Sequence, residues 1–333
     1  MRLILWIVGV LAFLWGGYWF VGAATLERST VAWLEDRRAD GWVADYDSVV
    51  TRGFPSRFDT TLNGLDIADP DTGVAWQAPF FQILSLSYKP NHVTAVWPGE
   101  QVFSTPLQSI DISSSYMQGS MVFEPNTDLA LQRTQIVMND LALVSSEGWT
   151  SALAEGRLAV WQSEADPLVY DIGFEALEFE PAGPILDLLA SGSDLPDTIS
   201  QLYLDTEAAF DEPWDRHAIE DARPQPTAID LRLLRATWGE MDLQMTGQVL
   251  VDEQGYPDGE VSVQAKNWRD MLALAVRAGA LSDDLRPTVE RALEILAGLT
   301  GNPDAIDAKV GFRNGSVTFG PFPIGPAPRL VIR

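Results

Sequence analysis

The distribution of hydrophobic residues changes near residue 24, and this change predicts two kinds of structure in one chain. The stretch that begins at Leu3 and ends at Ala24 carries no charge. A helix of that length can cross the roughly 30 Å hydrocarbon core of a bilayer. From Trp42 onward, apolar and polar residues alternate, as in strands that bury one face. The sequence therefore predicts an amino-terminal transmembrane helix followed by a β-rich body.

A cleaved signal peptide is the alternative to a retained anchor, because Gly22-Ala23-Ala24 resembles a cleavage site of small residues. The apolar region of a signal peptide is normally about 7–15 residues long. The stretch here is longer and contains several tryptophans. Arg2 and the amino terminus precede it, and positive charges favour the cytoplasmic side. We therefore expect a single-pass protein of the bacterial inner membrane, with a cytoplasmic amino terminus and a periplasmic body.

Within the body, short alternating segments separated by turn residues predict a meander of antiparallel strands. Residues 25–41 have helical spacing and end at Gly41, which predicts a stalk that prolongs the membrane helix. Asn63-Gly64 and Asp71-Thr72-Gly73 are typical of turns, and Asn314-Gly315 of a final hairpin. The polar, proline-rich residues 211–226 indicate a link between two lobes.

Two helices are expected in the second lobe. Asn267 is placed to cap a helix over residues 268–278. Asp283 and Asp284, with Pro287 in the first turn, open another helix. We expect its apolar stripe to pack on the sheet; the stripe consists of Leu285, Val289, Leu293, Leu296 and Leu299.

The predicted organisation is an anchor at residues 1–24, a helical stalk at 25–41, a β-rich lobe at 42–212, and a second β-rich lobe with two helices at 226–333. The fold class is α+β and mainly antiparallel β, with elongated curved sheets and a few packed helices after the transmembrane helix.

Composition narrows the function classes. The chain has 22 Lys and Arg against 47 Asp and Glu, a formal charge of −25, which argues against nucleic acid as a partner. It has no cysteine, which excludes disulfides and thiolate metal sites, and only two histidines. The common nucleotide-binding, hydrolase and zinc-protease motifs do not occur. The sequence therefore indicates no catalytic residues, no cofactor and no metal, and we expect a protein that is not an enzyme.

The most distinctive segment is Arg52-Gly53-Phe54-Pro55-Ser56-Arg57, in which glycine and proline predict a sharp reversal before a strand. One interpretation is the rim of a binding groove, with both arginines available to an anionic head group. The other is a tight corner whose arginines pair with nearby acids. The candidate ligand-binding residues are Arg52, Phe54, Arg57, His92 and Trp97.

Three segments resemble the domain of unknown function family 2125. They are Arg52-Gly53-Phe54-Pro55, Tyr88-Lys89-Pro90-Asn91-His92-Val93, and the stretch from Gly311 to Gly320 with Gly325-Pro326-Ala327-Pro328. The resemblance covers nearly the whole chain and implies an alphaproteobacterial protein with an amino-terminal membrane segment. It implies no activity and no catalytic residues. The chain is also similar in texture to AsmA-like and TamB-like periplasmic proteins, which implies a curved sheet with an apolar trough and a role in lipid traffic or envelope maintenance.

Two functional hypotheses follow. The anchor, the strand meander and the tryptophans beyond the span favour a protein that binds a lipid or another apolar ligand along its sheet. The alternative is a structural scaffold or protein-interaction module of the cell envelope without a small ligand, because open sheet edges can accept a partner's strand. The protein partner in that case is unknown.

Overall fold

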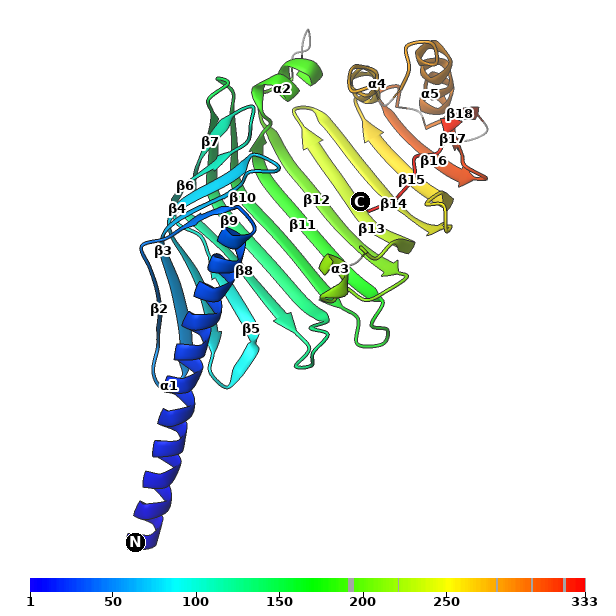
Figure 1. Cartoon of the computed structure of the whole chain (residues 1–333). Helices are drawn as coiled ribbons and strands as arrows, with labels where there is room; N and C mark the ends of the chain where they lie inside the picture. Colours follow the sequence, from blue (N-terminus) through cyan, green and yellow to red (C-terminus); the bar gives the residue numbers. More distant parts are fainter. Residues whose placement is uncertain (191–194, 221, 280, 301, 320–321, 333) are drawn as a thin grey trace. The chain divides into compact units, whose positions relative to one another are not determined.

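The structure is a computed structural model that describes residues 1–190, 195–220, 222–279, 281–300, 302–319 and 322–332. It is built mainly from antiparallel strands after a long apolar helix, with a few shorter helices, which confirms the fold class (Figure 1). Its contacts divide it into unit 1, Met1–Phe123 with Ile136–Trp149, and unit 2, Glu124–Gln135 with Thr150–Arg333. Gly320, the last residue of the stretch from Gly311 that resembles the family, lies outside the described residues, as does Arg333.

Unit 1 consists of one long helix and a set of antiparallel strands. The helix is α1 (Arg2–Ala39). The strands are β1 (Val43–Asp45), β2 (Ser48–Arg52), β3 (Arg57–Asp69), β4 (Val74–Leu86), β5 (Lys89–Val96), β6 (Glu100–Ser104), β7 (Ser109–Ser113), β8 (Tyr116–Phe123) and most of β9 (Leu131–Ser145).

The second half of α1 lies against the sheet of unit 1, next to β2 and β3 (Figure 1). Its Leu34 is fully buried, and a carboxylate oxygen of Glu27 accepts a 2.6 Å hydrogen bond from the backbone N–H of Thr51. Residues 25–39 are thus helical as expected, but they do not form a stalk, because they cover apolar strand residues. The buried cluster consists of Leu34, Ala44, Leu62 and Leu65.

Two of the expected chain breaks have different outcomes. Gly41 ends α1 as expected, since its N–H bonds the Arg38 carbonyl while that of Trp42 bonds Arg37. Asn63-Gly64, in contrast, is not a turn but lies within β3. Gly64 has φ +60°, and a Cβ there would fall 2.3 Å from a carboxylate oxygen of Asp47. This irregularity lets β1 and β2 pair with the same edge of β3, one on each side of the glycine.

Unit 2 contains one antiparallel series of long strands. These are β10 (Thr150–Gln162), β11 (Val169–Glu180), β12 (Ile199–Phe210), β13 (Pro226–Trp238), β14 (Met241–Val251), β15 (Pro257–Lys266), β16 (Ala305–Arg313), β17 (Ser316–Phe319) and β18 (Phe322–Pro326). The helices are α2 (Gly183–Ala190), α3 (His217–Glu220), α4 (Trp268–Arg277) and α5 (Arg286–Thr300).

The proline-rich segment at residues 211–225 does not separate two lobes. It connects β12 to β13, which pair with each other from Gln201↔Thr237 to Phe210↔Pro226. A connection between neighbouring hydrogen-bonded strands belongs inside a folded unit, whatever its proline content. The expected boundary between residues 212 and 226 is therefore wrong: the whole stretch from Thr150 onward belongs to unit 2, together with Glu124–Gln135.

Helices α4 and α5 pack on the end of the unit 2 sheet formed by β14–β17, as expected for an apolar stripe. Asn267, however, does not cap α4 with its side chain; it has φ +55° and its amide donates to the Glu240 carbonyl. The side chain of Leu299 lies outside the described part of the chain. The residues in contact include Ala265, Trp268, Leu272, Leu285, Val289, Leu293, Leu296 and Ile306.

The final hairpin is confirmed. Asn314 and Gly315, with φ +52° and +68°, connect β16 to β17. The chain beyond it forms the short strand β18 on β17 and then crosses neighbouring hairpin ends. The N–H of Leu330 bonds the Gly255 carbonyl, and Gln225 bonds both backbone groups of Ile332.

Replacing Leu34 by Ala should destabilise unit 1 by about 2–5 kcal/mol, because the substitution leaves a cavity between α1 and the sheet. The measurement is urea unfolding of the full chain in detergent, monitored by circular dichroism. Leu26→Ala on the same helix is the control, since Leu26 is 38% exposed and should lose far less. Equal losses in the two variants would contradict the packing described.

Candidate functional site

The segment expected to form a groove rim is a turn that packs on the apolar part of α1. It connects β2 to β3, and the N–H groups of Ser56 and Arg57 both bond the Gly53 carbonyl. The Phe54 ring stacks on Phe20 at 5.6 Å and meets Trp19 edge-on at 5.4 Å. Aromatic pairs of this kind contribute about 0.5–1.5 kcal/mol beyond the area they bury.

Hydrogen bonds from aromatic side chains of α1 fix the turn in place. Trp15 Nε1 donates to the Pro55 carbonyl at 2.9 Å, and Trp19 Nε1 donates to the Arg57 carbonyl at 2.7 Å. The Tyr18 hydroxyl donates to the carbonyl of Ser87, in the turn between β4 and β5, at 2.6 Å. The neighbouring helix residue Gly22 allows close approach, since a Cβ there would lie 2.7 Å from the Phe58 ring.

The two arginines of this turn do not enclose a pocket. Arg57 pairs with Asp59 at 3.0 Å, as the tight-corner interpretation expects, and Arg52 is exposed on the neighbouring strand. Arg52 and Asp59 are register partners, so these three side chains share the face of the sheet that points away from Phe58.

His92 and Trp97 do not join them. His92 lies on β5, where its Nε2 is 3.0 Å from the Ser120 hydroxyl. Trp97 follows β5 and points to the opposite face, where its ring contacts Phe81 at 5.5 Å. The five residues singled out in the sequence therefore form no common site. The turn holds three of them, and the other two lie on different faces of β5.

An apolar row crosses the sheet of unit 2 that the sequence analysis did not identify. Five apolar residues are direct register partners on five successive strands, so they form one row across the same face of the sheet. We call this row the apolar strip; it consists of Leu158 on β10, Phe174 on β11, Leu204 on β12, Leu234 on β13 and Met245 on β14. With neighbouring strands about 4.8 Å apart, the row extends about 19 Å.

The apolar strip is only partly buried, and no member belongs to a buried cluster formed by the described residues. At one end of this face, α4 and α5 cover β14–β17. At the other, Trp214 from the β12–β13 connection packs against Tyr170 and Phe210. Burial raises the pKa of Tyr170, whose hydroxyl accepts a hydrogen bond from the Trp214 N–H. The strip lies between these two covered regions.

The opposite face of the same strands carries a polar row beside the strip. The row of register partners next to the strip contains Arg157, Glu175, Tyr203, Arg235 and Gln244. Arg235 donates to Asp242 at 2.6 Å. Burial works to raise the pKa of Asp242, but hydrogen bonds from Arg235 and Gln244 outweigh it and lower that pKa overall. The sheet of unit 2 therefore has an apolar row on one face and a polar row on the other.

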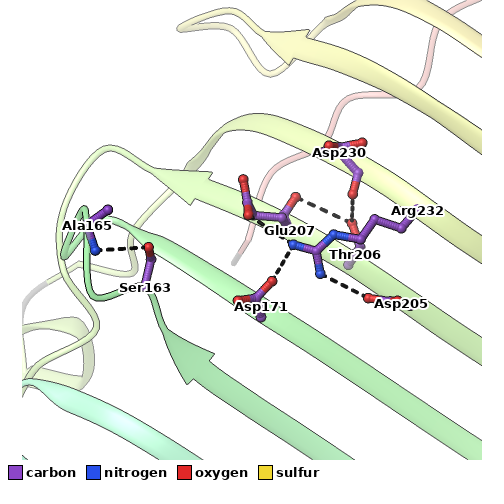
Figure 2. Close-up of polar contacts among 8 residues, drawn as sticks. All are labelled: Ser163, Ala165, Asp171, Asp205, Thr206, Glu207, Asp230 and Arg232. Atoms are coloured by element: carbon purple, nitrogen blue, oxygen red, sulfur yellow. Dashed lines mark hydrogen bonds and ion pairs between the residues drawn. The ribbon is translucent and has the colours of Figure 1, made fainter.

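An irregularity in β13 strengthens this division. The register with β14 shifts between Leu231 and Leu234, which keeps both leucines on the apolar face. Arg232, between them, reaches three carboxylates on the polar face (Figure 2). It bonds Asp171, Asp205 at 3.2 Å and Glu207 at 3.0 Å. The hydrogen bond to Asp171 is the main reason that the pKa of Arg232 is raised.

Within the described ranges, no three His, Asp or Glu side chains are grouped as a metal ion would require. A hollow of about 660 Å³ in unit 1 has acidic lining residues, but Asp66 is already engaged by the Gln77 amide. Two exposed features are therefore considered further: the apolar strip and the β2–β3 turn on α1.

Comparison with known proteins identifies the family. A family model described as an uncharacterized protein conserved in bacteria, DUF2125, matches residues 19–328. The chain belongs to DUF2125. No curated protein and no solved structure matches it. The DUF2125 match begins at Trp19, so it includes Trp19 and Phe20, which contact the β2–β3 turn, but not Trp15 or Tyr18.

Two of the segments that resemble DUF2125 lie next to each other in the structure. The turn at residues 53–56 and the segment that begins at Tyr88 meet through Ser87, whose N–H bonds the Ser56 carbonyl and whose hydroxyl donates to Pro55. The period-two signal for β11 and β12 was present in the sequence, in Tyr170, Ile172 and Phe174, for example. The strip itself could not be identified without the strand register.

Replacing Arg232 by Gln should lower the free energy of unfolding by about 1 kcal/mol at low salt, because three neighbouring carboxylates lose their shared cation. The loss should shrink in 1 M salt, where the Debye length is about 3 Å.

Urea unfolding at two salt concentrations measures this effect. The control is Arg157→Gln, which removes a single exposed pair with Glu155 and should change stability by less than about 0.5 kcal/mol. A loss at Arg232 that is independent of salt would contradict the electrostatic explanation.

Proposed function

We propose that this protein is a membrane-anchored binding protein that holds a lipid or another apolar ligand along the apolar strip of unit 2, in the service of envelope maintenance. The observation that carries the proposal is the row of five partly exposed apolar residues on β10–β14. An apolar row on a sheet needs something to cover it, and exposed apolar patches of this kind mark binding surfaces.

The dimensions suit one extended acyl chain. Such a chain spans about half of the roughly 30 Å hydrocarbon core, or about 15 Å, and the strip extends about 19 Å. The strip lacks charged residues, whereas acids and arginines crowd the opposite face. We propose binding rather than catalysis because the strip offers only apolar contact to a ligand.

The proposed location is the bacterial inner membrane, with α1 as a single-pass anchor and the body in the periplasm. Helix α1 is long and apolar enough to cross a membrane. Arg2 is the only charged side chain before its apolar stretch and favours a cytoplasmic amino terminus. This location would place the strip close to a supply of lipid.

Photo-crosslinking in bacterial cells tests the binding proposal on the full chain. Benzoylphenylalanine at position 204 should yield a covalent adduct with the mass of a lipid after irradiation. At position 203 it should not, because Leu204 and Tyr203 are neighbours on β12 that face opposite sides of the sheet. Mass spectrometry of the digested protein locates the adduct.

Equal lipid labelling at both positions, or none at either, would refute the proposal. An adduct with another protein at position 204 would favour the scaffold interpretation instead. A companion variant, Leu234→Gln with the probe at position 204, should reduce the lipid adduct severalfold while circular dichroism shows an unchanged strand content.

A further inference from the structure

The β2–β3 turn lies at an unusual position along the apolar helix. It packs against residues 15–22 of α1, while the uncharged stretch runs from Leu3 to Ala24. At 1.5 Å per residue, Trp15 and Trp19 are about 18 and 24 Å from Leu3 along the helix. A span that begins at Leu3 needs about 30 Å to cross the hydrocarbon core. The turn is therefore held about 6–12 Å short of the far boundary.

Shifting the helix outward would move the turn into water, but it would also bring charged groups into the hydrocarbon core. If Trp15 were at the far boundary, only about 18 Å of uncharged helix would remain inside, and Arg2 with the charged amino terminus would enter the hydrocarbon. We infer that the β2–β3 turn is inserted into the distal leaflet as a second membrane contact beside α1. This inference rests on the proposed anchor and is independent of lipid binding by the apolar strip.

Several backbone groups of the turn are bonded by protein partners, which suits this environment. Irregular backbone at membrane depth is tolerated only where protein partners bond its polar groups. The Pro55 carbonyl accepts from Trp15 and from the Ser87 hydroxyl, and the Arg57 carbonyl accepts from Trp19. The Ser56 carbonyl and N–H are also both bonded, and Pro55 has no N–H to satisfy.

The exposed side chains at this end of unit 1 match a lipid interface. Phe54 is 56% exposed although it lies beside α1, and Tyr88 in the neighbouring turn is 58% exposed. Aromatic side chains favour the boundary between head groups and acyl chains. Arg52, Arg57 and Lys89 flank the turns, with two acids beside them: Asp59, which pairs with Arg57, and Glu27, which accepts from the Thr51 N–H next to Arg52. This grouping of cations stands out in a chain of net charge −25. A local cationic surface of this kind suits anionic head groups.

The absence of cysteine makes site-directed spin labelling a direct test, because each introduced cysteine is unique. The full chain is labelled at Leu11→Cys, Phe54→Cys, Tyr88→Cys or Leu107→Cys and reconstituted in nanodiscs of phosphatidylethanolamine and phosphatidylglycerol. Leu107 is the aqueous reference; it is 84% exposed and follows β6, beside the β3–β4 turn at the far end of β3. Leu11 is the reference within the span.

Electron paramagnetic resonance then compares the access of oxygen and of a water-soluble nickel chelate to each label. Lipid immersion lowers only nickel access, whereas packing against protein lowers both. At positions 54 and 88 we expect nickel access several times lower than at position 107, with oxygen access retained. Because Tyr88→Cys leaves Phe54 in place, it reports on the turn even if Phe54→Cys loosens it.

Two outcomes would overturn the inference. If labels at 54 and 88 are as open to nickel as the label at 107 while position 11 is shielded, α1 spans the bilayer but the turn stays in water, as in a locally thinned membrane. If position 11 is also open to nickel, the anchor itself fails, and with it the proposed location. Neither outcome bears on ligand binding by the apolar strip.

Discussion

A sheet with one apolar face is stable in water only if something covers that face, and this constraint organises both units of the protein. In unit 1 the cover is α1, whose Leu34 and Trp19 are buried among strand residues. In unit 2 the cover is divided: α4 and α5 pack on β14–β17, and Trp214 packs on the other end. The apolar strip is the part of the face that these elements leave partly exposed, and it is there that a ligand would replace a missing layer.

Much of this architecture could be predicted from the sequence because its signals are local. The uncharged stretch, the alternating segments, and the Asn314-Gly315 hairpin each depend on residues close together in the chain. The end of the first helix at Gly41 and the apolar stripe of α5 could be predicted in the same way. Local signals failed where tertiary context decides. Asn63-Gly64 reads as a turn, but pairing with β1, β2 and β4 holds it within a strand.

The candidate site shows the same limit. The reversal at residues 53–56 was predictable from Gly53 and Pro55, yet its contact with α1 depends on residues more than 30 positions away. His92 and Trp97 could not be assigned to opposite faces of β5 before its register was known. The prolines of residues 211–225 suggested a linker because composition does not reveal which strands pair. The apolar strip is entirely a product of register, which no single segment encodes.

The continuity of α1 has a consequence for how the protein is made. If α1 is the anchor proposed above, its apolar half enters the membrane while the strands are still being synthesised. Unit 1 then completes its core on Leu34 and Trp19 of an element whose other end is already fixed. Its strands would consequently assemble at the bilayer surface, not in free solution. Removal of residues before Ala24 would take away the indole and phenol donors that hold both turns, so the fold of unit 1 depends on the helix that precedes it.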